Sequence, residues 1–123
     1  MLQDHFLRKF QYVRLSVTDN CNFKCKYCLP NGYQKTCSDS NLSLSEIDCL
    51  VAGLVEMGVW KIRLTGGEPT LRSDLTDIIC LIKKYPAIKQ IGLTTNGYKL
   101  ADKVNEYFEA GLTNLNVSID SLD

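Results

Sequence analysis

Hydrophobic and polar residues alternate along four short stretches of the chain, and this alternation is typical of half-buried β-strands. The stretches are residues 12–18, 60–65, 90–96 and 114–120, and turn-forming residues follow each of them. In every stretch one set of alternate positions is apolar. These positions are Val13, Leu15, Val17, Ile62, Leu64, Ile91, Leu93, Leu115, Val117 and Ile119. The pattern predicts four strands whose apolar faces pack against helices.

The positions between these apolar residues are mostly polar or small. They are Arg14, Ser16, Lys61, Arg63, Thr65, Gly92, Thr94, Asn96, Asn116, Ser118 and Asp120. A sheet covered by helices on both faces would show near-continuous apolar runs in its strands, and these strands do not. A polar second face instead fits a curved, barrel-like sheet wrapped around a ligand.

Three helices are predicted between the strands, because apolar residues recur there every three or four positions. The first begins at Ser43, which forms a capping box with Glu46, and it ends at Gly58. The second follows Ser73, and the third covers residues 100–110. The residues expected to be buried on these helices are Ile47, Leu50, Val51, Leu54, Val55, Leu75, Ile78, Ile79, Ile82, Leu100, Val104 and Tyr107.

The regular alternation of strands and helices predicts an α/β fold with a parallel sheet. Four strands and three helices are too few to close an eight-unit (βα) barrel. We therefore expect the chain to form part of a larger, incomplete (βα) barrel.

Composition narrows the function classes further. Of the 123 residues, 45% are hydrophobic and 23% are charged, as in a soluble globular domain. The 14 Lys and Arg residues balance 14 Asp and Glu residues, so net charge favours neither nucleic acid nor an anionic membrane as a partner. Apolar runs are far shorter than the roughly 18 residues of a membrane span, and the first ten residues lack a signal-peptide pattern. We expect a cytoplasmic protein.

Three of the six cysteines form a tight cluster. Cys21, Cys25 and Cys28 lie within eight residues in the loop after the first predicted strand. Three thiolates at this spacing can hold three irons of a 4Fe-4S cluster, which leaves the fourth iron open to a ligand that is not a cysteine. The alternatives are a zinc site completed by His5 or Cys37, or three reduced thiols without a metal.

The other three cysteines are scattered along the chain. Cys37 as a fourth cluster ligand would occupy the iron that is otherwise open. Cys49 and Cys80 lie off the apolar stripes of their helices, so we expect exposed or half-exposed thiols without a function.

Basic side chains gather on the predicted polar face of the sheet. Arg14, Lys61 and Arg63 all fall there, and a buried cation without a partner is costly. An anionic ligand such as a triphosphate would supply that partner, and Arg can hold it with two parallel hydrogen bonds. Ion pairs with Asp120 or Glu68 inside the protein are the alternative.

Several motifs carry a resemblance to a known family. The chain contains C-x3-C-x2-C with Tyr27 before the third cysteine, Gly66-Gly67-Glu68-Pro69 after the second strand, and the stretches 13–19, 93–97 and 115–120. Together they resemble the radical S-adenosylmethionine (SAM) superfamily, and within it the GTP 3',8-cyclases of molybdenum cofactor biosynthesis. The resemblance runs from Tyr12 to Asp123.

This resemblance implies a lyase that converts GTP to 3',8-cyclo-GTP. It implies a 4Fe-4S cluster on Cys21, Cys25 and Cys28, whose open iron binds SAM and whose electron cleaves SAM to a 5'-deoxyadenosyl radical. That radical would remove the 3' hydrogen of the GTP ribose. The sugar carbon would then attack C8 of guanine.

The resemblance also assigns individual residues. SAM is expected to contact Tyr27, Gly67 and Ser118, and GTP is expected to contact Arg14, Arg63 and Thr94, with a weaker assignment for Lys61. From the residues alone, Tyr27 could instead be a loop aromatic that closes over the core. The glycine pair could be an ordinary turn at the end of a strand.

The same resemblance sets expectations for the rest of the protein. Residues 1–123 correspond to the N-terminal part of a radical SAM core domain, truncated and without a second domain. A C-terminal part with a second 4Fe-4S cluster, an external electron donor and a homodimer are the expected partners. Two alternatives stay open: the same half of a radical SAM enzyme that matures peptides or cofactors, and a zinc or redox module that is not an enzyme.

Overall fold

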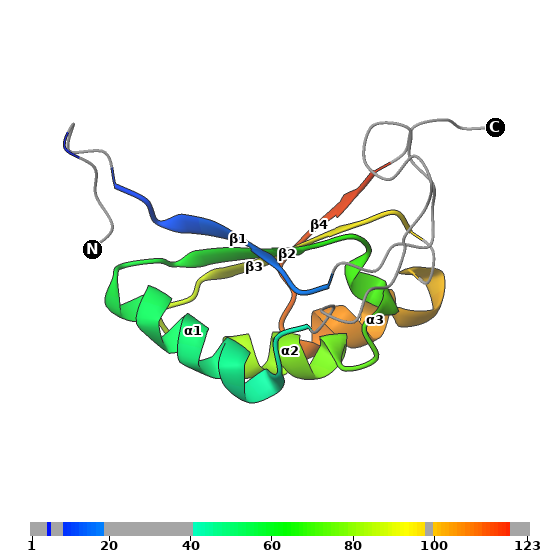
Figure 1. Ribbon diagram of the computed structural model, residues 1–123. Coiled ribbons are helices and arrows are strands. Elements are labelled where there is room, and N and C mark those ends of the chain that lie inside the picture. The colour runs from blue at the N-terminus through cyan, green and yellow to red at the C-terminus, as the bar shows by residue number, and fades with distance from the viewer. Residues whose placement is uncertain (1–4, 6–8, 19–40, 98–99, 119–123) are drawn as a thin grey trace.

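The structure is a computed structural model that describes residues 5, 9–18, 41–97 and 100–118 (Figure 1). Strands and helices alternate along these residues. In chain order they are β1 (Tyr12–Ser16), α1 (Leu44–Glu56), β2 (Lys61–Thr65), the 3-10 helix η1 (Pro69–Leu71), α2 (Leu75–Lys83), β3 (Gln90–Thr95), α3 (Leu100–Ala110) and β4 (Asn114–Val117). The predicted α/β order of four strands and three helices is confirmed.

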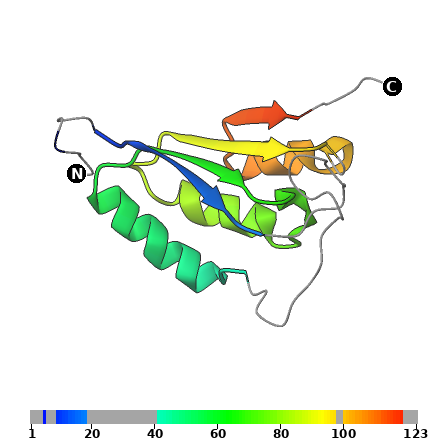
Figure 2. The same cartoon turned by 45° about the horizontal axis from the view of Figure 1, so that its top comes forward.

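All four strands are parallel and lie in the order β1-β2-β3-β4, as Figure 2 shows. Consecutive strands are therefore neighbours, and each helix connects one strand to the next. Arg14 on β1 pairs in register with Arg63 on β2, which pairs with Gly92 on β3. Because the strands are parallel, the carboxyl ends of all four meet at one edge of the sheet.

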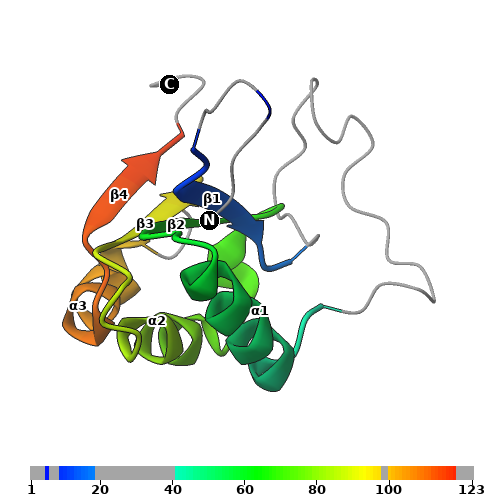
Figure 3. The same ribbon diagram turned by 90° about the vertical axis from the view of Figure 1, so that its left-hand side faces the viewer.

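The molecule has two layers, with the three helices on one face of the sheet (Figures 1 and 3). The predicted apolar strand face is the one that they cover. Ile62, Leu64, Ile91 and Leu93 are each at most 1% exposed, and they pack against buried residues of α1 and α2. None of the described helices covers the polar face, which remains open.

Local signals set the limits of the helices. Ser43 and Glu46 form the predicted capping box of α1, in which the Ser43 hydroxyl accepts a hydrogen bond from the Glu46 amide. Helix α2 buries the four predicted residues and ends before Pro86. Helix α3 ends at Ala110, and Gly111 follows it with φ +131°, a conformation that L side chains rarely adopt.

Some predicted core positions are more exposed than expected. Leu50 is 38% exposed, because Ile47 and Val51 face the core and leave Leu50 on the flank of α1. Leu100 and Val104 are half-buried, and Tyr107 is the buried residue of α3. On the edge strand β4, Leu115 is half-buried and Val117 is 40% exposed, because the helices cover the central strands more fully than this edge. The prediction of a buried position is therefore wrong for Leu50 and only partly met by Leu100 and Val104.

None of the helices in the described part of the chain is long and apolar enough to span a membrane.

Candidate active site on the polar face of the sheet

An open groove of about 620 Å³ lies on the polar face of the sheet. Four residues that the family resemblance assigns to ligands line it, namely Arg14, Arg63, Thr94 and Ser118. The other lining residues are Tyr12, Leu115, Asn116 and Val117. The strand pattern and the resemblance therefore converge on one surface.

Arg63 lines this groove and is only 9% exposed. Its Nε donates to the Tyr12 hydroxyl at 2.9 Å, and its Nη1 donates to the Thr94 hydroxyl at 3.4 Å. With the Asn116 amide turned so that its oxygen faces the guanidinium, Nη1 also donates to that oxygen at 3.1 Å. All of these acceptors are neutral, and no carboxylate among the described residues forms an ion pair with Arg63.

Gly92 makes room for the Arg63 guanidinium. A Cβ atom at residue 92 would lie 3.1 Å from Arg63 Cζ and 3.3 Å from Nη2, which is closer than ordinary van der Waals contact. The guanidinium therefore reaches across β3 toward Thr94 and Asn116 because β3 has no side chain at this position. From its place in the strand pattern Gly92 falls on the polar face, where no role for it is evident from sequence. A glycine inside a strand, in register with an arginine, is the signal that could have found it.

Arg14 and Lys61 differ from Arg63 in their surroundings. Arg14 is exposed and lines the groove beside its register partner Arg63. Lys61 is half-buried, does not line the groove, and places its Nζ 4.7 Å from the centre of the Tyr12 ring. Such a contact between an ammonium group and an aromatic face is attractive. Lys61 therefore packs on Tyr12, the same side chain whose hydroxyl holds Arg63.

Backbone hydrogen bonds gather the carboxyl ends of the strands. The Gly67 amide donates to the Thr18 carbonyl at 2.8 Å, and the Ser118 amide donates to the Thr95 carbonyl at 2.8 Å. Gly66 has φ +147°, and a Cβ atom there would lie 2.3 Å from the Thr18 oxygen. Gly66 is thus required by the close approach of the chain's own backbone. Gly67 is exposed at the same edge of the sheet.

Glu68 is a buried carboxylate that joins the ends of β2 and β3. It is 1% exposed, and its Oε2 accepts from the Thr70 amide at 3.1 Å, from the Thr70 hydroxyl and from the Thr95 hydroxyl at 2.6 Å. Its Oε1 accepts from the Asn96 amide at 2.7 Å. The suggested ion pair of Glu68 with an arginine or lysine of the polar face is therefore wrong, because these donors hold both carboxylate oxygens.

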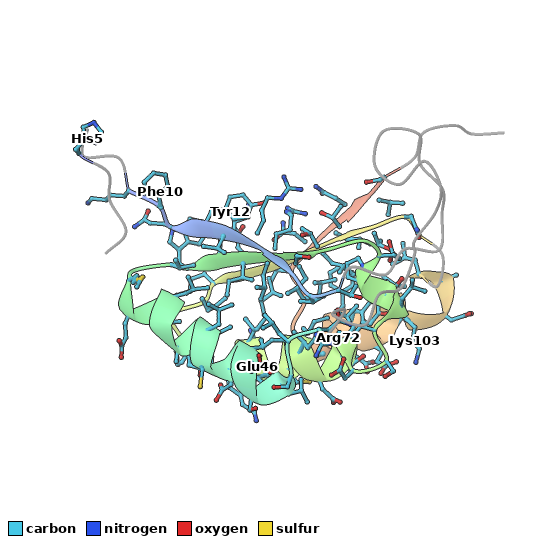
Figure 4. All side chains as sticks on the ribbon, viewed as in Figure 1. His5, Phe10, Tyr12, Glu46, Arg72 and Lys103 are labelled. Atoms are coloured by element: carbon cyan, nitrogen blue, oxygen red, sulfur yellow. The ribbon has the colours of Figure 1, made fainter. Side chains whose placement is uncertain are left out.

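Other predicted site residues lie outside the described residues. They are Cys21, Cys25, Tyr27, Cys28, Cys37 and Asp120. The segment that contains the cysteine trio follows Thr18, at the carboxyl end of β1, whereas the exposed His5 precedes β1 (Figure 4). Cys49 and Cys80 are exposed free thiols, as expected. Within the described residues, no three His, Cys, Asp or Glu side chains lie close enough together to hold a metal ion.

The sequence model of the radical SAM superfamily matches residues 15–123. The chain belongs to the radical SAM superfamily. A curated relative from Shewanella denitrificans, named GTP 3',8-cyclase, is 56% identical over 122 residues, which are 99% of this chain and 36% of the relative. The GTP 3',8-cyclase of Aeromonas hydrophila is 54% identical over 127 residues, or 99% of this chain and 37% of that protein. This radical SAM chain thus spans little more than a third of the length of these relatives.

Solved structures share the fold. The crystal structure of BtrN in complex with AdoMet and 2-DOIA has a TM-score of 0.74 and 22% sequence identity, and the match covers 89% of this chain and 46% of that chain. An open conformation of BtrN has a TM-score of 0.72 and also 22% identity, and that match covers 50% of its chain. The two-layer arrangement of this radical SAM chain is therefore one that recurs in solved proteins.

Proposed function

We propose that this radical SAM chain is the cluster- and SAM-binding part of a GTP 3',8-cyclase, a lyase that converts GTP to 3',8-cyclo-7,8-dihydro-GTP in molybdenum cofactor biosynthesis. Identity above 50% to proteins of that name supports the activity. The buried Arg63, whose acceptors among the described residues are all neutral, lies in an open groove, and this observation carries the proposal. A cation in that setting is stabilised by an anionic ligand.

The donor set fits a 4Fe-4S cluster. Cys21, Cys25 and Cys28 offer three thiols, and three thiolates leave one iron free for a different ligand. Their segment follows the carboxyl end of β1, and in a parallel sheet that is the edge where β2, β3 and β4 also end. The cluster would therefore lie beside Gly67 and Ser118. When bound, the cluster and SAM supply a carbon-centred radical by one-electron cleavage of SAM.

The residues of the chain bind and orient the two small molecules. Gly67 and Ser118 at the strand ends, together with Tyr27 next to the third cysteine, hold SAM. Arg14, Arg63 and Thr94 hold the triphosphate of GTP in the groove. Lys61 contributes less, because it acts through the Tyr12 ring rather than from the groove lining. A fixed triphosphate limits the positions of the ribose, and such positioning contributes several powers of ten to a rate.

The proposed enzyme also needs a C-terminal part and an external electron donor. The chain matches little more than a third of each cyclase, so residues 1–123 would form the N-terminal part of the radical SAM core domain. A second 4Fe-4S cluster that holds the guanine base would lie in the C-terminal part. An external electron donor would reduce the first cluster, and the complete enzyme would work in the cytoplasm as a monomer or a homodimer.

Anaerobic reconstitution of the complete protein with iron and sulfide tests the cluster. We expect Cys25→Ala to remove about four irons per chain and to abolish formation of 5'-deoxyadenosine from SAM, because one thiolate ligand is lost. Cys49→Ala is the matched control, since this exposed thiol on α1 should leave both properties unchanged. Tightly bound zinc without iron uptake would instead indicate a zinc module and would overturn the proposal.

Substrate choice is tested with the same reconstituted protein. With GTP, SAM and a reductant we expect 3',8-cyclo-GTP, detected by mass spectrometry. If the protein forms 5'-deoxyadenosine from SAM but neither binds GTP nor yields a cyclised product, it would be a radical SAM enzyme that acts on a peptide or another cofactor. Loss of the product in Arg63→Ala, with SAM cleavage retained in the absence of GTP, would assign the groove to GTP.

A further inference from the structure

Arg72 lies directly after η1 (Figure 4), and its side chain is only 9% exposed. Its Nη1 donates to the Val17 carbonyl at 2.9 Å, and its Nη2 donates to the Leu42 carbonyl. Val17 follows β1, and Leu42 precedes Ser43, the N-cap of α1. One guanidinium group therefore binds the backbone on both sides of residues 18–41.

A carboxylate holds this guanidinium in place. Asp74 Oδ1 lies 2.5 Å from Arg72 Nε, and Asp74 Oδ2 lies 3.2 Å from Nη2. The hydrogen bond from Arg72 lowers the pKa of the Asp74 carboxyl, against the opposing effect of burial, and the positive charge of Arg72 adds to the lowering. Arg72 thus uses its donors in two directions, toward Asp74 and toward two distant carbonyls.

Only a planar fork of donors fits this arrangement. A guanidinium presents five N–H groups in fixed directions, whereas the ammonium group of lysine is a single point at the end of a flexible stem. Without Arg72, the two carbonyls would lose their partner inside a half-buried region, and Asp74 would lose its counter-ion. The backbone before and after the intervening segment would then lose the side chain that binds both of them, while the hydrogen bond from the Gly67 amide to the Thr18 carbonyl would remain.

The segment between Val17 and Leu42 contains the cysteine trio, and Cys21 is only four residues beyond Val17. We propose that Arg72, held by Asp74, is a positioning residue that ties the backbone before the cysteine trio to the backbone after it and so supports retention of the cluster. The inference rests on the proposed function, because it assigns Arg72 a role toward the cluster. Arg72 acts through the backbone and does not contact the cluster or SAM.

The same contacts join the cysteine segment to the strand ends. Arg72 follows η1, and η1 follows Glu68, whose carboxylate binds the Thr95 hydroxyl and the Asn96 amide at the end of β3. Gly67 immediately precedes Glu68. The chain from Val17 through Arg72 and Glu68 to β3 is therefore one connected unit. Loss of Arg72 would separate Val17 and Leu42 from this unit.

Variants of the complete, reconstituted protein test this role. Arg72→Gln removes the charge and the fork, Arg72→Lys keeps only the charge, and Asp74→Asn removes the counter-ion. Asp77→Asn is the matched control, because Asp77 is an exposed carboxylate in the first turn of α2, the helix that begins directly after Asp74. Ile82→Ala is the control for stability, because this fully buried residue supports the core at the far end of α2.

The SAM-binding cluster is recognised by the change in its electron paramagnetic resonance signal when SAM is added. The first measurement is the rate at which an iron chelator removes this cluster. A hydrogen bond from a charged group in a half-buried site corresponds to a change of about tenfold or more when it is lost. We expect Arg72→Gln to lose this cluster about tenfold faster, with Arg72→Lys between it and the wild type. We also expect Arg72→Gln to weaken the spectral change that SAM causes, which a loss of global stability would not do.

The second measurement needs no cluster. Trypsin is added to the metal-free protein, and cleavage after Lys24, Lys26 and Lys35, all within the segment, is followed by mass spectrometry. We expect Arg72→Gln to accelerate these cleavages about tenfold, because the charged guanidinium group no longer binds the carbonyls of Val17 and Leu42. Ile82→Ala should leave these cleavages unchanged, since it destabilises the core without touching the clamp.

The outcomes separate the inference from the proposed function. If the wild type shows no cluster that responds to SAM, the proposed function fails, and the tryptic measurement still decides whether Arg72 holds the segment. If the wild type has that cluster and Arg72→Gln matches it in both measurements, the inference is overturned and the proposed function stands. Equal acceleration in Arg72→Gln and Ile82→Ala would also overturn the inference, because the effect would then be one of global stability.

Discussion

Arg63 and Arg72 both have little-exposed side chains, yet their surroundings differ in charge. Arg63 is 9% exposed as a residue, and the side chain of Arg72 is 9% exposed. Arg72, which directly follows η1, contacts the Asp74 carboxylate and two backbone carbonyls. The carboxylate neutralises its charge within the protein. Arg63 contacts two hydroxyls and one amide oxygen on the open face of the sheet. The ion pair of Arg72 supports the structure, whereas Arg63, without a counter-ion among the described residues, is suited to bind an anionic ligand.

The position of Arg14 strengthens this contrast. Arg14 and Arg63 are register partners on neighbouring strands, and like charges directly opposite one another destabilise a sheet. Nothing in the described part of the chain offsets this repulsion with a carboxylate. A bound anion would offset it, and a triphosphate carries enough charge to satisfy both guanidinium groups. The cost in the free protein is therefore consistent with a binding site for an anion.

The largest expected effect is on stability. Arg72→Ala should lower the free energy of unfolding by about 2 to 3 kcal/mol, because it leaves a partly buried carboxylate and two carbonyls without their donor. Arg63→Ala should change it by less than about 1 kcal/mol, because water can replace the guanidinium at the open groove. Urea unfolding of the metal-free protein measures both. Equal losses in the two variants would show that Arg63 is as structural as Arg72.

For the affinity of GTP, the substitution of Arg63 should have a larger effect than the substitution of Arg72. Arg63→Ala should weaken GTP binding by about 1.5 to 3 kcal/mol, which is roughly 10-fold to 150-fold in Kd, because a charge-assisted contact to phosphate is lost. SAM binding should change less in this variant, whereas Ser118→Ala should affect SAM more than GTP. Calorimetric titration of the complete protein with each ligand measures these effects. Parallel losses for both ligands in Arg63→Ala would contradict separate sites on one wall.

A smaller effect is expected at Gly92. Gly92→Ala places a methyl group 3.1 Å from Arg63 Cζ and should weaken GTP binding by about 1 kcal/mol, as the guanidinium moves away. In the Arg63→Ala background the same change should have almost no effect on GTP, because the two residues are coupled. Gly53→Ala in α1 is the matched control, since a Cβ atom there meets no other atom within 4 Å. Additive losses in the double variant would show that Gly92 acts independently of Arg63.

The smallest expected effect is a dependence of stability on pH. The pKa of Asp74 is lowered in the folded protein, chiefly by its hydrogen bond with Arg72. The pair therefore stabilises the fold fully above the ordinary carboxyl value of 3.8, and this contribution is lost as the pH falls through the lower folded value. The contribution should be less than about 1 kcal/mol, as for other ion pairs that are partly in contact with water.

Unfolding free energies measured from pH 6 to pH 2 test this sign. Asp74→Asn should remove part of the loss of stability at acid pH, and Asp77→Asn should remove less of it. An identical pH dependence in Asp74→Asn and the wild type would show that Asp74 does not hold Arg72 through its charge.

The order and type of the elements could be predicted from local sequence. Alternation of period two identified all four strands, and the capping box of Ser43 and Glu46 marked the start of α1. The same alternation placed Arg14, Arg63, Thr94 and Ser118 on one face, which the groove confirms. These properties follow from the geometry of a single strand or helix, so each can be recognised without knowledge of its neighbours.

The exposure of Leu50 and Val117 could not be predicted in this way, because it depends on how far each helix covers the sheet. Glu68 provides a similar case. From sequence it was a candidate partner for arginine, but the approach of β3 brings the Thr95 hydroxyl and the Asn96 amide to its oxygens. A carboxylate pairs with the donors that the fold brings near it, and sequence distance does not reveal them.

The sequence by itself therefore determined the class of fold, the polar face and the cysteine motif that the superfamily shares. Tertiary structure decided which distant groups surround its two little-exposed arginines. Arg63 lies in the middle of β2 and contacts Tyr12 and Thr94, whereas Arg72 directly follows η1 and binds the carbonyls of Val17 and Leu42. The physical reason is that these hydroxyl and carbonyl contacts join residues about 30 to 55 positions apart in the chain, which meet only when the sheet and helices assemble, whereas the ion pair of Arg72 with Asp74 is local.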